Sequence, residues 1–266
     1  MEVNMEEKII SESLTKDFRH HLAREERSDS TIEKYVKEIL RFAQWMKGLP
    51  VTKEEVSRWK EHLLKEKFAP ATVNVRLAAL NSFFDFCGWQ DCRVKSLRLQ
   101  KKMFRDSSRE LSREEYERLL KAARDTGKDN LMLIIETICS TGIRVSEIKY
   151  ITVESVGDGK AEIFLKGKIR TILIPNKLCR KLRKFAQKNK ITSGEIFLSE
   201  RGRPIDRRTI WAAMKSICHE AGVESSKVFP HNLRHLFARC FYRTCRDISK
   251  PVSYTHLRAH ETLSDL

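Results

Sequence analysis

The apolar residues of the first ninety positions recur at intervals of three and four, and this periodicity constrains the fold more than any other feature. Between Thr31 and Lys47 they form one stripe, made of Ile32, Val36, Ile39, Ala43 and Met46. Such spacing places apolar side chains on one face of an α-helix. Similar stripes occupy 52–67 and 71–87, and we expect a further helix over 13–27. The N-terminal part therefore predicts a compact bundle of helices.

The pattern changes in the second half of the chain. A capping box at 112–115 predicts a helix start, and a buried helix is expected over 130–139. β-forming residues then cluster over 161–165 and 171–174, on either side of the basic segment 166–170. This alternation predicts a β-hairpin with a basic tip. Further helices are expected over 176–189, 206–221 and 231–246. The predicted fold class is thus mainly α with a small β-sheet.

Composition and periodicity together predict the domain organisation. Residues 8–90 form a helical domain, and residues 110–250 form a second, α+β domain. Between them, residues 91–109 lose the helical period and gain Lys and Arg, which predicts a basic interdomain linker. Residues 251–266 begin with Pro251, which interrupts a helical pattern. They are predicted to be a tail that differs in character from the rest of the domain.

The balance of charge favours a polyanionic partner. The 266 residues include 52 Lys and Arg against 36 Asp and Glu, a net charge of +16. The span 160–190 alone holds eleven Lys and Arg residues and one acidic residue, Glu162. This excess of positive charge is larger than a surface that serves only solubility requires. Nucleic acid is the commonest polyanion for such a protein, because neutralising phosphates releases condensed counterions.

Two other features bound the cellular setting. No apolar run approaches the ~18 residues that a bilayer span requires, so we expect no membrane association. Seven cysteines occur without a C-x-x-C pair, and most lie in apolar stretches. A disulfide framework or zinc site is therefore not expected, and a reducing cytoplasm is the predicted location.

Two short motifs carry candidate chemistry. The first is Thr-Gly-Ile-Arg-Val-Ser-Glu at 141–147, and the second is His-Asn-Leu-Arg-His at 231–235. Each places an arginine, Arg144 or Arg234, at a helix start, where free N–H groups and the dipole attract phosphate. Arginine adds a planar fork that binds phosphate oxygens bidentately. Together with His231, the pair predicts a site for a phosphodiester.

These two motifs, in this order and separated by a basic hairpin, resemble the arginine boxes of the tyrosine recombinase (phage integrase) family. The basic helical N-terminal part resembles the family's core-binding domain, and 110–250 its catalytic domain. The resemblance implies that Arg144 and Arg234 clamp the scissile phosphate of DNA, with His231 as hydrogen-bond donor or proton carrier. The family lysine, a general acid to the departing 5′-hydroxyl, matches Lys166 best, with Lys168 as the alternative. Glu147 either orients Arg144 or helps to pack its helix.

The same resemblance defines the expected partners. Double-stranded DNA is the substrate, cut and rejoined through a 3′-phosphotyrosyl bond, and self-association on DNA is expected. No metal and no organic cofactor are expected, because fixed cations do the electrostatic work. Whether the reaction is integration, excision or resolution is left open, as are the target site and the number of subunits.

The family's nucleophilic tyrosine has no clear counterpart. The family's Leu-Gly-His box is missing after 247–250, and the tail 251–266 reads as foreign or misread. Tyr254 is a weak candidate, and Tyr242 is expected in the core. The remaining tyrosines, Tyr35, Tyr116 and Tyr150, are expected in the core or at its rim. This copy is therefore predicted to bind DNA and to be inactive in cleavage.

Two alternative functions use the same basic surface. One is a non-catalytic DNA-binding protein, such as a regulator or accessory factor. The other is an RNA-binding protein, which would expose stacking aromatics on strands, whereas Phe164 is the sole aromatic of the predicted hairpin. Two arginines and a histidine directed at one phosphate favour the recombinase.

Overall fold

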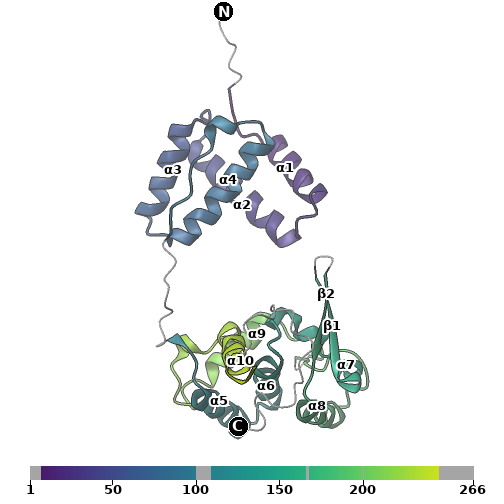
Figure 1. Cartoon of the computed structure of the whole chain (residues 1–266). Coiled ribbons are helices and arrows are strands. Elements are labelled where there is room, and N and C mark those ends of the chain that lie inside the picture. The colour runs from purple at the N-terminus through teal and green to yellow at the C-terminus, as the bar shows by residue number, and fades with distance from the viewer. Residues whose placement is uncertain (1–6, 100–108, 166–167, 200, 246–266) are drawn as a thin grey trace, which may run out of the picture. The chain divides into compact units, whose positions relative to one another are not determined.

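The structure is a computed structural model that describes residues 7–99, 109–165, 168–199 and 201–245, excluding the side chains at 165, 168, 244 and 245. The chain divides into two compact units, Met1–Met103 and Phe104–Leu266 (Figure 1). Each unit has its own apolar core. No helix in the described ranges is long and apolar enough to cross a membrane.

The N-terminal unit is a bundle of helices, as the periodicity predicts (Figure 1). Its helices are α1 (Glu12–Arg24), α2 (Asp29–Met46), α3 (Lys53–Lys65) and α4 (Pro70–Phe86). The predicted stripes become the buried faces, and the core contains the aromatic rings of Phe18, Phe42, Phe83 and Phe84, all fully buried. Ser11 and Thr52 accept backbone N–H bonds at the starts of α1 and α3, which fixes where those helices begin.

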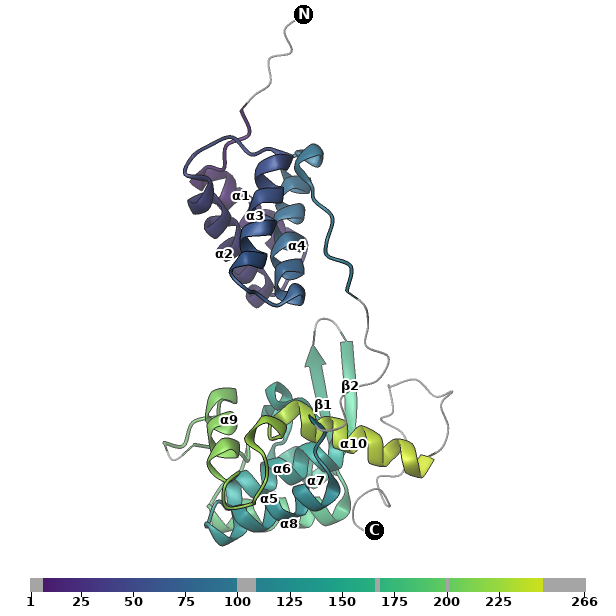
Figure 2. The same cartoon turned by 90° about the vertical axis from the view of Figure 1, so that its left-hand side faces the viewer.

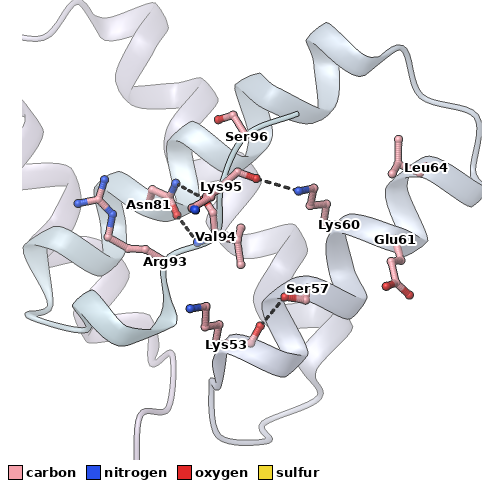
Figure 3. A pocket seen from close by; sticks show the side chains of 10 residues that line it. All are labelled: Lys53, Ser57, Lys60, Glu61, Leu64, Asn81, Arg93, Val94, Lys95 and Ser96. Carbon is pink, nitrogen blue, oxygen red and sulfur yellow. Dashed lines mark hydrogen bonds between the residues drawn. The ribbon is translucent and has the colours of Figure 1, made fainter. Parts of the chain in front are cut away.

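The segment that follows α4 packs against the N-terminal unit. After the short 3₁₀ helix η1 (Gln90–Cys92), the side chains of Cys92 and Val94 are buried in its core. The Asn81 side chain accepts a hydrogen bond from the Val94 N–H (3.2 Å) and donates one to the Val94 carbonyl (3.0 Å) (Figure 3). Asn74 holds both backbone groups of Leu97 in the same way. The predicted linker 91–109 is therefore not a free connection over 92–97, and residues 100–108 lie outside the described set.

The C-terminal unit is mainly helical, and its described residues include a two-stranded sheet that projects from one side of the helices (Figure 2). Its elements are α5 (Arg113–Asp125), α6 (Asp129–Thr141), η3 (Val145–Tyr150), α7 (Val153–Asp158), β1 (Lys160–Leu165), β2 (Lys168–Leu173), α8 (Asn176–Lys188), α9 (Arg207–Ser216), η4 (Ser225–Lys227) and α10 (Pro230–Cys245). The predicted capping box opens α5, with both reciprocal bonds between Ser112 and Glu115. α6 is buried along most of its length and packs against α5, α8 and α10. The mainly helical prediction with a small sheet is thus confirmed.

The hairpin differs from its prediction in the bounds of the second strand, which begins three residues earlier than 171. Strands β1 and β2 pair antiparallel, with Ile163 opposite Arg170 and Ala161 opposite Ile172. Because β2 begins at Lys168, Arg170 lies inside the strand and not in the basic tip predicted from the sequence. Strand alternation then puts Arg170 on the same face as the buried Ile163 and Ile172.

Part of the basic charge of α8 is used inside the fold. Lys181 pairs with Glu136 of α6 (2.5 Å), and Lys188 pairs with Asp129 at the start of α6 (2.9 Å). Arg183 donates to the backbone carbonyl of Val156 (3.1 Å). These contacts fasten α8 to α6 and α7, so the lopsided composition of 160–190 is partly structural.

Gly142 controls how closely α6 and α10 approach. It ends α6 in the left-handed conformation, with φ +63°. A Cβ at this position would clash with the Cδ1 and Cε1 atoms of Phe237, which lies on α10. Glycine is therefore required at this position for two reasons: the backbone has a left-handed conformation, and the Phe237 ring leaves no space for a side chain.

We expect Gly142→Ala to lower the free energy of unfolding of the C-terminal unit by about 2–4 kcal/mol, from left-handed strain and overpacking together. Gly159→Ala is the matched control, because Gly159 also ends a helix at positive φ (+71°), but a Cβ there would meet nothing within 4 Å. The control should lose only about 1 kcal/mol. Equal losses in urea unfolding of the two variants would contradict the close packing of Phe237 on Gly142.

Candidate active site

Arg144 is fixed by a carboxylate that the same turn supplies. It precedes η3, and its backbone N–H donates to Glu147 Oε2 (2.8 Å) while its Nη1 donates to Glu147 Oε1 (2.8 Å). Glu147 is only 1% exposed, whereas the Arg144 side chain is 56% exposed. The carboxylate is thus buried and orients an arginine whose remaining N–H groups face solvent. Of the two roles considered for Glu147, orientation of Arg144 has direct support.

Arg234 reaches the same place from α10. Its Nη1 donates to the backbone carbonyl of Gly142, two residues before Arg144. Burial lowers the pKa of Arg234, and the positive charges of Arg144 and Arg170 lower that pKa further, while Glu147 opposes them. The structure therefore brings together two arginines that are ninety positions apart in the sequence. Their roles in a reaction stay a prediction.

His231 lies at the start of α10, one turn before Arg234. Its side chain is exposed, and its ring meets the ring of His235 edge-on, with centroids 4.3 Å apart. The buried Asn232 fixes this turn, since its Nδ2 donates to the carbonyls of Arg109 (2.9 Å) and Lys227 (2.7 Å). Residues three apart share a helix face, so His231 and Arg234 point in a similar direction.

The structure does not place the predicted lysine. Lys166 lies outside the described residues, and so does the side chain of Lys168. A cation that sequence reasoning did not assign is found instead. Arg170 Nη2 donates to Glu147 Oε2 at 2.5 Å, so the cluster contains a third guanidinium.

Two tyrosines of the C-terminal unit are buried or hydrogen-bonded within the fold. Burial raises the pKa of Tyr116 well above its usual range, and the Tyr150 hydroxyl donates to the Phe164 carbonyl (3.0 Å). Tyr242 is 53% exposed, so its prediction as a core residue is wrong. The buried face of α10 carries Leu233 and Leu236, and Tyr242 projects from another side of the helix. Tyr254 lies outside the described residues.

A second positively charged surface lies on the N-terminal unit. An open pocket there is bordered by α3, α4 and the segment after η1 (Figure 3). Its charged lining consists of Lys53, Lys60, Glu61, Arg93 and Lys95. Lys60 donates to the Lys95 carbonyl (2.8 Å), and Arg93 pairs with Asp85. Within the described part of the chain, no group of three or more His, Cys, Asp and Glu residues could hold a metal ion.

The arginine cluster is suited to an anion. Two guanidinium groups bind one buried carboxylate, and the guanidinium of Arg234 lies nearby on the Gly142 carbonyl, which leaves a net positive charge at a partly exposed position. Arginine binds the oxygens of phosphate through parallel N–H bonds, and the exposed part of Arg144 has such donors available. A phosphodiester whose charge grows during a reaction is stabilised by such preorganised donors.

The comparison with protein families agrees with this fold. The model of the "Phage integrase family" matches residues 109–256, and that of the "Phage integrase, N-terminal SAM-like domain" matches residues 15–91. The chain belongs to the phage integrase family, the class of the tyrosine recombinases. The first match ends beyond residue 250, where the sequence alone predicts a change of character.

Several curated relatives and solved structures are similar to this chain. The chain is 29% identical over 230 residues to tyrosine recombinase XerA of Thermococcus kodakarensis, covering 84% of this chain and 78% of the relative. It is 29% identical over 247 residues to tyrosine recombinase XerC of Roseiflexus castenholzii, covering 83% and 77%. Among solved structures, lambda integrase bound to DNA has a TM-score of 0.70 at 20% identity, covering 92% of this chain and 90% of that one. This last similarity concerns the fold.

If the cluster binds anions, inorganic phosphate should stabilise the C-terminal unit against heat. At about ten times its Kd, phosphate adds about 1.4 kcal/mol, which corresponds to about 3–6 °C in Tm. Arg234→Ala should abolish most of this shift, measured against chloride at equal ionic strength. Lys184→Ala, an exposed lysine of α8, is the control and should keep the shift. A shift that is equal in both variants would place phosphate elsewhere.

Proposed function

We propose that this chain is a site-specific DNA recombinase or integrase of the tyrosine type. Its C-terminal unit binds the scissile phosphate of duplex DNA between Arg144 and Arg234. The observation that carries this proposal is the approach of Arg234 to Gly142, which joins the two arginine motifs at one point of the fold. Membership of the phage integrase family supports the reaction class.

The proposed chemistry follows from the charges. In the family's reaction a tyrosine oxygen attacks phosphorus and the bond from phosphorus to the 5′-oxygen breaks, which leaves a 3′-phosphotyrosyl ester. Negative charge on the non-bridging oxygens grows in the transition state, and Arg144 and Arg234 donate to those oxygens. His231 holds or transfers a proton at the phosphate, and Lys166 or Lys168 gives a proton to the departing 5′-oxygen. The ester preserves the energy for rejoining the strand.

Both units contribute to the proposed DNA contact. The basic pocket of the N-terminal unit, defined by the lining residues of Figure 3, offers cations for backbone phosphates. Related folds occur in a lambda integrase dimer on a core site and in a lambda integrase tetramer on a Holliday junction. By analogy, we propose that copies of this chain assemble on DNA.

A non-catalytic DNA-binding role is the second candidate. It is favoured by the surroundings of Tyr116 and Tyr150, one deeply buried and the other hydrogen-bonded to a backbone carbonyl. A chain with the phosphate clamp and without a nucleophile would position DNA and not cut it. Covalent trapping separates the two candidates.

Duplex DNA binding should depend steeply on salt. If six to ten phosphates are contacted, affinity falls by about 10³–10⁵ between 50 and 200 mM salt. Arg144→Ala should retain most of the affinity and reduce the salt slope by about one, because one phosphate contact is lost among many. Fluorescence anisotropy with a labelled duplex measures both quantities. A flat salt dependence would contradict the proposed DNA contact.

A suicide DNA substrate tests the nucleophile. We expect this chain to form no covalent adduct, since Tyr116 is buried and the Tyr150 hydroxyl is hydrogen-bonded to the Phe164 carbonyl. Should an adduct form, Tyr254→Phe should abolish it, and so should Arg234→Ala. Denaturing gel electrophoresis of the reaction gives the readout. An adduct that survives both substitutions would refute the assignment of the cluster as the reaction site.

A further inference from the structure

We propose that Arg170 is a positioning residue of the phosphate site, acting through Glu147 to keep one edge of Arg144 available for the phosphate. This inference rests on the proposed function, since it deepens the description of the same site. It assigns a role to a strand residue whose side chain is partly buried, at 28% exposure.

The first step concerns the hydrogen bonds of Glu147. Oε1 accepts from Arg144 Nη1, and Oε2 accepts both from the Arg144 backbone N–H and from Arg170 Nη2 (2.5 Å). Burial of a carboxylate is unfavourable unless its oxygens are well hydrogen-bonded. At 1% exposure, Glu147 meets this condition only with the donors of both arginines.

The second step concerns the place of Arg170 in the sheet. It lies opposite Ile163 and on the same strand face as Ile172, which are 1% and 6% exposed. A buried ion pair is seldom the most stable choice for such a position, because well-packed apolar side chains do as well or better. The pair of Arg170 and Glu147 is therefore better explained by the orientation of Arg144 than by the stability of the unit.

The third step concerns the hydrogen bonds that Glu147 Oε2 would accept in the absence of Arg170. A free arginine and a free carboxylate favour a bidentate pair, with two parallel N–H bonds. Here Oε2 is already bonded to Arg170, so Arg144 gives Glu147 one side-chain bond, from Nη1. The rest of the Arg144 guanidinium stays partly exposed. Without Arg170, we expect the Arg144 fork to turn onto both oxygens and to lose donors for the phosphate.

The fourth step concerns charge. Glu147 neutralises one of the two arginines that it binds, and Arg234 adds a further positive charge close by. Both Arg144 and Arg170 lower the pKa of Arg234, which shows that their fields reach it. Arg170 therefore helps to leave the cluster short of negative charge, which a bound phosphate supplies.

The test compares Arg170→Met and Arg170→Lys with Lys160→Met, a control that removes an exposed cation of the same hairpin, paired loosely with Glu162 (3.8 Å). Inorganic phosphate is the probe, titrated by calorimetry. We expect Arg170→Met to weaken phosphate binding about tenfold, within the range for residues in contact. Arg170→Lys, which can still donate to Oε2, should lose less, and Lys160→Met should lose less than twofold.

Two further measurements isolate the route through Glu147. In the Glu147→Gln background, Arg170→Met should weaken phosphate binding clearly less than it does with Glu147 present, since the carboxylate that Arg170 shields is gone and only the loss of its charge remains. The ¹⁵N-detected side-chain resonances of Arg144 should shift in Arg170→Met and not in Lys160→Met. Should Arg170→Met fail to fold, the Arg170→Lys variant carries both readouts.

The outcomes separate this inference from the proposed function. Equal effects of Arg170→Met and Lys160→Met, or an effect of Arg170→Met that persists in full with Glu147→Gln, would overturn the positioning role. If the unaltered chain binds neither phosphate nor duplex DNA, the proposed function fails. The Arg144 resonances still report whether Arg170 sets the geometry of that side chain.

Discussion

The approach of α10 to the C-terminal end of α6 is the contact on which the rest of the C-terminal unit depends. Gly142 allows it, because the ring of Phe237 occupies the space that any side chain at this position would need. The carbonyl of the same glycine receives a hydrogen bond from Arg234. A helix end is thus capped by a side chain from a distant helix. The two arginine motifs meet because the backbone at Gly142 can turn left-handed and lie close to α10.

Electrostatics explain why this meeting point is not simply a structural ion-pair network. Two arginines bind one carboxylate and Arg234 lies near them, so the cluster is unbalanced. Burial lowers the pKa of Arg234 most, and the charges of Arg144 and Arg170 lower it further. Like charges at such distances oppose folding unless something compensates them. Here the compensation inside the protein is incomplete, and the exposed part of Arg144 points the remaining charge to solvent. A stable fold with an unsatisfied cationic cluster is typical of a site built for an anion.

The sequence predicted the elements well where a single physical signal decides them. The stripe from Ile32 to Met46 and the capping residue Ser112 mark α2 and the start of α5, and both are found. Periodicity predicted the structure wrongly where side chains from a distant part of the sequence hold a segment in place. Cys92 and Val94 read as linker because the bonds from Asn81 that hold this segment come from another helix. Periodicity cannot show such contacts.

Tertiary contacts, which the sequence pattern does not reveal, also explain why some residues of the site were predicted and others were not. Arg144 and Arg234 stand in recognisable motifs beside a glycine and a proline, so they could be named from the sequence. Arg170 lies between Ile169 and Thr171, and neither phase of the alternation is clearly apolar, so its inward direction depends on the strand register. The burial of Glu147 likewise comes from tertiary packing.

The position of the proposed phosphate clamp in the core of the C-terminal unit has a physical reason. The clamp needs rigid support, and it is built from a helix end, a 3₁₀ turn and a strand that share the core of the C-terminal unit. Its residual charge opposes folding in the free protein and favours the bound state, as is common where function is gained at some cost in stability. A phosphate would satisfy the exposed N–H groups of Arg144 and relieve the repulsion around Arg234. Binding of DNA and stability of this unit should therefore be coupled through the same three arginines, whichever segment provides the attacking oxygen.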